Sequence, residues 1–179
     1  SVVGRVREGG LESLSDAERA AFVGDANEFM GSVTAPGFKF YSDKVIQGVY
    51  EKYMAEGALS PSVTPANFFA AQILTDEAMA KRSVEHMRGH PDDLMVVLSD
   101  IDRCTYGLGA PGRLERVGGT RLNRESFKVK TLLLNPTAKD SLSPIKSLRL
   151  NIGVGANQAK VTRPVGNYMW FSKSPPPNL

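Results

Sequence analysis

The sequence contains few of the residues that build covalent or metal-bound frameworks. Its single cysteine, Cys104, excludes a disulfide within the chain and any metal site that needs several cysteines from this chain alone. Its two histidines, His86 and His90, are four residues apart, but Gly89 predicts that the helix ends before His90. We therefore interpret them as surface residues and expect no metal site.

Long hydrophobic runs are also absent. A membrane-spanning helix needs about 20 mostly apolar residues, whereas charges interrupt every apolar stretch of this chain within a few positions. No basic segment with an apolar core follows Ser1 as in a signal peptide, and we interpret this start as the result of processing or truncation. We expect no transmembrane segment within the chain.

The composition is that of a folded globular domain, with 41% apolar and 23% charged residues. The charge is unevenly distributed. Residues 1–120 carry 12 Lys and Arg against 17 Asp and Glu, and residues 121–179 carry 10 against 2. A basic segment of this kind favours an acidic protein or lipid partner, although its dispersed charges are also typical of a solvated surface and no nucleic-acid motif accompanies them.

Helical periodicity predicts three helices, over residues 16–30, 41–55 and 65–88. The third has the strongest signals, because Thr64 is a good N-cap and Pro65 fits the first helical turn. The side chains of this helix that we expect to be buried are Phe68, Phe69, Ile73 and Met79.

Leu94 to Leu98 is a continuous apolar run that directly follows this helix, and it predicts a buried, parallel strand. Further strands are predicted over residues 128–134, 147–152 and 168–172, where the aromatic side chains are expected in the core. The order of these elements predicts an α/β fold in which helices pack on a small, mostly parallel sheet.

Three segments in this order resemble the ChaN-like family (haem-binding uptake, Tiki superfamily), in its plant and algal plastid branch: residues 67–80 (NFFAAQILTDEAMA), 96–113 and 167–172 (NYMWFS). The resemblance covers residues 14–174 as the C-terminal part of such a domain. Residues 1–13 are then an N-terminal extension and residues 175–179 a proline-rich tail. The resemblance implies haem or another tetrapyrrole as the ligand and a chloroplast location, in the stroma or at the thylakoid.

The sequence departs from the family at two places. The family's opening strand, which leads to a Gly-Glu-x-His motif, is absent, so we expect a sheet edge that another polypeptide or a preceding segment completes. Where the family has Gly-x-Gly-His, this chain has Asp100-Ile101-Asp102-Arg103. Arginine cannot replace histidine as a ligand or base, because it stays protonated and only donates hydrogen bonds, but it can bind a carboxylate or phosphate.

The candidate ligand-binding residues surround the end of the predicted strand and the glycine-rich loop. They are Arg103, Cys104, Tyr106, Gly107, Gly109, Asp76 and Gln72. Cys104 and Tyr106 are residue types that ligate haem iron, although each is also an ordinary loop residue. Gly107 and Gly109 favour a backbone turn or close approach. Asp76 and Glu77 are adjacent on a helix, point about 100° apart and cannot act on one substrate atom.

The sequence therefore predicts a protein that binds and does not catalyse. The resemblance makes haem the first ligand hypothesis. The alternative is a ligand-free structural or interaction subunit of a larger, membrane-associated chloroplast assembly. Its protein partners would bind the sheet edge and the basic segment 121–179.

Overall fold

The structure is a computed structural model that describes residues 1–23, 26–31, 33–34, 37–122, 127–136, 147–152 and 159–172. Its helices are α1 (Val2–Gly9), η1 (Leu11–Ser13), α2 (Asp16–Phe22), α3 (Ala26–Gly31), α4 (Phe38–Tyr41), the π-helical η2 (Ser42–Ile46), α5 (Gln47–Ala55), α6 (Pro65–Gly89), α7 (Ile101–Cys104), η3 (Thr105–Gly107) and α8 (Ala110–Leu122). Its strands are β1 (Leu132–Leu134), β2 (Ser147–Ile152), β3 (Ala159–Pro164) and β4 (Tyr168–Trp170).

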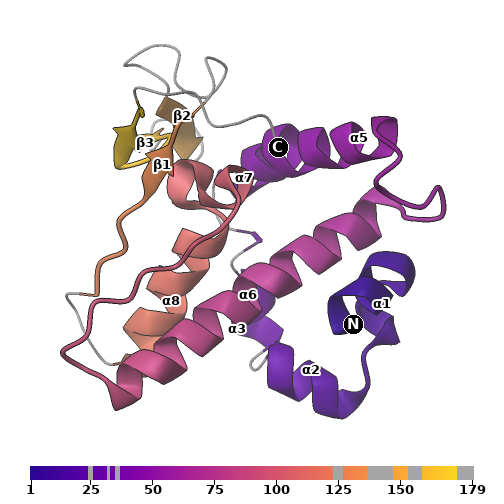
Figure 1. The fold of residues 1–179 in the computed structure, drawn as a ribbon, viewed down its shortest axis with the longest axis horizontal. Coiled ribbons are helices and arrows are strands. Elements are labelled where there is room, and N and C mark those ends of the chain that lie inside the picture. The colour runs from indigo at the N-terminus through magenta and orange to yellow at the C-terminus, as the bar shows by residue number, and fades with distance from the viewer. Residues whose placement is uncertain are drawn as a thin grey trace.

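Helix α6 is the central element and runs diagonally across the molecule (Figure 1). Its start confirms the prediction, because the Thr64 side chain accepts a hydrogen bond from the Asn67 amide at 3.2 Å and Pro65 occupies the first turn. Its 25 residues span roughly 37 Å. Phe68 and Ile73 are buried, while Phe69 and Met79 are half-buried.

The helices before α6 form one side of the core. Helix α1 packs on α6 with Val6 fully buried, so residues that we assigned to an extension contribute to the main apolar cluster. The helix predicted over residues 16–30 is two helices in the described residues, α2 and α3. The helix predicted over 41–55 is present as η2 and α5, which continue α4 without a break.

The described strands form two separate two-stranded sheets, and their small size agrees with the predicted α/β fold class. β1 pairs with β4 in parallel, with Leu132 opposite Tyr168 and Leu134 opposite Trp170. β2 pairs with β3 antiparallel. The first pair and β2 agree with predicted strands, whereas the sequence analysis missed β3.

The prediction of a buried strand over Leu94 to Leu98 is wrong. This segment is extended but belongs to no strand, and Leu94, Val96 and Leu98 are 90%, 69% and 84% exposed. The physical reason is that no other strand lies beside it in the described part of the chain. A parallel strand exists only as one partner of a hydrogen-bonded ladder.

Candidate functional site: an apolar groove between two extended segments

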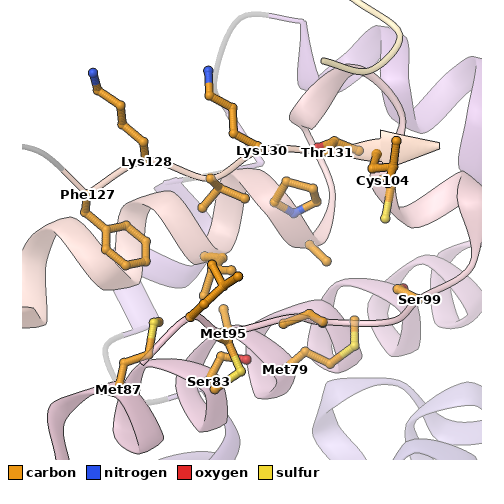
Figure 2. A pocket seen from close by; sticks show the side chains of 18 of the residues that line it. Met79, Ser83, Met87, Met95, Ser99, Cys104, Phe127, Lys128, Lys130 and Thr131 are labelled. Carbon is orange, nitrogen blue, oxygen red and sulfur yellow. The ribbon is translucent and has the colours of Figure 1, made fainter. Parts of the chain in front are cut away.

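A groove of about 450 Å³ separates the extended segments 93–99 and 127–132 (Figure 2). Its floor consists of side chains from α6 and α8, and three of its lining residues are methionines. A volume of this size is typical of small-molecule sites. The groove side chains used below are Met79, Ala80, Met87, Met95, Val97 and Leu114.

Side-chain burial alternates along residues 127–134, as in a strand, and less regularly along residues 94–99, where the exposed Leu94 also lines the groove. Met95, Val97 and Ser99 line the groove, whereas Val96 and Leu98 do not and are exposed. In the other segment Phe127 points toward the groove, while Lys128 and Lys130 point away from it (Figure 2). The alternation continues in β1, where Leu133 is buried between the exposed Leu132 and Leu134.

The strand pair beside the groove has an exposed apolar face. Leu132 and Leu134 lie opposite Tyr168 and Trp170 in the register of β1 and β4, and all four side chains are more than half exposed. Phe171, which follows β4, is 59% exposed. The aromatic residues expected in the core are thus on the surface.

Two ion pairs join α6 to α7 and α8, the helices beside and beneath the groove. The first joins Asp76, which is buried, to Arg103 in α7. Arg103 also donates to the side-chain oxygen of Gln72 at 2.9 Å and to its backbone oxygen at 3.3 Å. Burial raises the pKa of Asp76, and the positive charge of Arg103 acts in the opposite direction. The structure thus brings Arg103, Asp76 and Gln72 together, with the guanidinium already bound to groups of α6.

The second ion pair joins α6 to α8. Glu77 accepts hydrogen bonds from Arg113 at 2.6 Å and from Arg116 at 2.5 and 2.7 Å. Arg113 is almost fully buried, and its Cζ lies 4.9 Å from the centre of the Phe29 ring. Because adjacent residues of α6 point in different directions, Asp76 binds α7 and Glu77 binds α8, and the two carboxylates do not form one site.

The glycine-rich loop forms a backbone turn with a close approach to a neighbouring segment, as its glycines predicted. Tyr106 and Gly107 both have positive φ, at 59° and 64°, and the Tyr106 amide donates to the Val165 carbonyl oxygen at 2.8 Å. A Cβ on Gly109 would lie 2.5 Å from the Tyr41 hydroxyl, so only glycine fits this close approach. Tyr41 is buried and donates to the Asp102 carbonyl oxygen at 2.9 Å. The sequence analysis missed this role of Tyr41.

Cys104 and Tyr106, the two candidate iron ligands, line different hollows. Cys104 lines the apolar groove. Tyr106 and Gly107 line a smaller hollow of about 190 Å³, on the side of Arg163 and Asn167. His86 and His90 stack on each other with ring centres 4.2 Å apart, and no cluster of three His, Cys, Asp or Glu residues that could hold a metal is found in the described ranges.

The sequence analysis also missed the groove methionines. Met79 and Met87 are eight residues apart on α6, a spacing that indicated only a core-facing stripe. Met95 lies in the segment taken for a buried strand. No local pattern marks these three side chains as the lining of one groove, because the α6 residues and Met95 meet only after the chain reverses direction at 90–93.

The fold and groove define a mostly helical α/β domain with an apolar groove of ligand size. Residues 1–114 match the model of the haem-binding uptake family, Tiki superfamily, ChaN, and the chain belongs to this family. A search of curated proteins and a search of solved structures gave no match. None of the described helices is long and apolar enough to cross a membrane.

We expect Asp76→Ala to lower the free energy of unfolding by about 3 kcal/mol, because it leaves the half-buried Arg103 guanidinium without the buried carboxylate that it binds. For a chain of this length the thermal midpoint should fall by roughly 10 °C, measured by circular dichroism. Asp43→Ala is the control, since the Lys39–Asp43 pair is exposed and should contribute little. Equal, small changes in both variants would show that the buried pair does not hold the fold.

Cys104 should react slowly with alkylating reagents in the folded protein. Burial raises the pKa of its thiol, and the charges of Asp76 and Asp100 raise it further, so the reactive thiolate is scarce at pH 8. Since the chain has one cysteine, the rate of iodoacetamide labelling by mass spectrometry reports this residue alone. We expect a rate well below that of the urea-unfolded chain, rising with pH above pH 9. Equal rates in the two states would contradict the geometry of this wall.

Proposed function

We propose that this chain is a non-catalytic binding protein and that the groove between segments 93–99 and 127–132 is its binding site. The observation that carries the proposal is the groove itself, an apolar site of ligand size beside which α7 and α8 are fixed to α6 by ion pairs with buried carboxylates. The acid and base candidates nearest to it support binding over catalysis. Asp76 binds Arg103, and Glu77 binds Arg113 of α8. Each of these charged side chains thus already has a partner within the protein.

Membership of a haem-binding family makes a tetrapyrrole the first small-molecule ligand to test. The donor set of the groove fits this group, because Met79, Met87 and Met95 offer neutral thioether sulfurs in apolar surroundings. Cys104 fits less well, since its raised pKa favours the thiol over the ligating thiolate. Lys128 and Lys130 point away from the groove and could meet propionates only at its rim. When bound, haem would supply its own iron chemistry.

The sequence made Arg103 a candidate ligand-binding residue, but its contacts indicate a structural role. Its guanidinium is engaged by Asp76 and Gln72, so its contribution is to fix α7 and the start of the glycine-rich loop on α6. Cys104, the next residue, is thereby held in the groove wall. We propose that Arg103 positions the site and does not bind the ligand.

The location in the chloroplast and the larger assembly remain predictions that rest on the sequence resemblance. The exposed apolar face of β1 and β4 supports a protein partner, because contiguous apolar surface is uncommon on isolated soluble domains. Co-sedimentation with stromal and thylakoid fractions would test both predictions.

The tetrapyrrole hypothesis predicts a change in the Soret absorbance of hemin on titration with the protein. The triple variant Met79→Leu, Met87→Leu, Met95→Leu keeps side-chain volume and removes the sulfur ligands. We expect it to weaken binding at least about tenfold, which corresponds to ~1.4 kcal/mol. Met30→Leu is the matched control, because Met30 is exposed on α3 and does not line the groove. No spectral change, or equal affinities for all variants, would exclude a tetrapyrrole in this groove.

A further inference from the structure

We infer that the groove receives an apolar β-strand from another polypeptide, inserted between segments 94–98 and 127–134 and parallel to both. The inference rests on the proposal that the groove is the binding site, and it names the partner for that site. It follows from the direction of the two walls, their side-chain pattern and their backbone groups.

The two walls run in the same direction. In Figure 2 the chain passes from Met95 to Ser99 along one side of the groove and from Phe127 to Thr131 along the other, both from left to right. The second wall leads directly into β1, which is already part of a parallel pair with β4. A strand placed between the walls would therefore extend an existing parallel sheet.

The side-chain pattern of the first wall and of β1, into which the second wall leads, is that of central parallel strands. Residues 127–131 of the second wall instead alternate apolar or hydroxyl side chains with Lys128 and Lys130. Central parallel strands carry apolar residues on both faces, because helices or other layers cover each face. Val97 faces the groove floor on α6, and its neighbours Val96 and Leu98 are apolar and exposed. In β1 the buried Leu133 has exposed leucines on both sides. The first wall and β1 thus have sequences suited to a sheet interior, although their outer side chains are exposed.

The backbone of the first wall has no partner in the described residues. Among the described residues no backbone hydrogen bond is made by residues 94 to 98, although the segment between α6 and α7 is drawn out in the ribbon of Figure 1. Free N–H and C=O groups on an extended segment are the template for addition of a strand, which is a common mode of peptide recognition. A small ligand could fill the groove but would leave most of these groups unpaired.

The chemistry of the incoming strand follows from the groove. Its inner face must pack on small and branched side chains of the floor, such as Ala80 and Leu114, which suits Val, Ile or Leu. Its outer face lies beside Lys128 and Lys130, which point away from the floor. Carboxylates at those positions would form favourable cross-strand pairs. The expected partner segment is therefore apolar on both faces with acidic residues near its start.

The probe is a fluorescein-labelled peptide of seven residues that begins with Asp-Val-Glu and continues with four Val, Ile or Leu residues. Its affinity is measured by fluorescence anisotropy against the intact chain and two adjacent variants. Val97→Asp places a charge in the groove wall and should weaken binding at least about tenfold. Val96→Asp places the same charge outside the groove and should change affinity less than about threefold. Circular dichroism confirms that both variants are folded.

Amide hydrogen exchange of the complex, followed by NMR, provides the second readout. Amides of one strand point alternately to opposite sides, so pairing on one edge should protect every second amide among residues 94–98. Uniform protection, absence of binding or equal affinity of the two variants would overturn the inference. Hemin binding without peptide binding would support the proposed function and reject the strand as the occupant of the groove. If neither hemin nor the peptide binds, both proposals are wrong. A dimer that Val97→Asp dissociates would instead assign the groove to a second copy of this chain.

Discussion

The buried carboxylates of α6 are the constraint on which the rest of the structure depends. Asp76 and Glu77 each lie almost completely out of solvent, and each has an arginine from a different element as its partner. An unpaired charge at such depth would cost several kcal/mol, so α7 and α8 must dock where they supply Arg103 and Arg113. This docking fixes the floor of the groove, where α6 and α8 meet, and places Cys104 of α7 at its lining.

The sequence predicted elements whose signals are local. Thr64 and Pro65 define the start of α6, and a strand was expected over the residues of β2. The prediction of a buried strand over residues 94–98 is wrong. An apolar run shows that a segment can occupy a sheet interior, but it does not show that another strand lies beside it. The apolar sequence of residues 94–98 is that of a strand, and the segment is exposed because no neighbouring strand pairs with it in the described part of the chain. β3 was missed because charged and polar residues interrupt its apolar pattern.

The candidate site was only partly accessible from sequence. Arg103, Asp76 and Gln72 were selected as separate residues, and the structure joins them in one internal network. Cys104 and Tyr106 are two residues apart but line different hollows, because the backbone at Tyr106 is in the left-handed region and turns the chain. The groove depends on contacts between α6, α8 and two extended segments, and none of these contacts has a local signature.

The most direct test is amide hydrogen exchange of the isolated chain, resolved residue by residue by NMR. Segment 94–98 has the sequence of a strand, and its backbone has no hydrogen-bond partner among the described residues, beside a floor in which ion pairs join α6 to α8. We expect the amides of residues 94–98 to exchange at nearly the rate of an unfolded peptide, while those of the middle of α6 exchange orders of magnitude more slowly. Strong protection of residues 94–98 in the isolated chain would contradict the claim, because their hydrogen bonds would already be made.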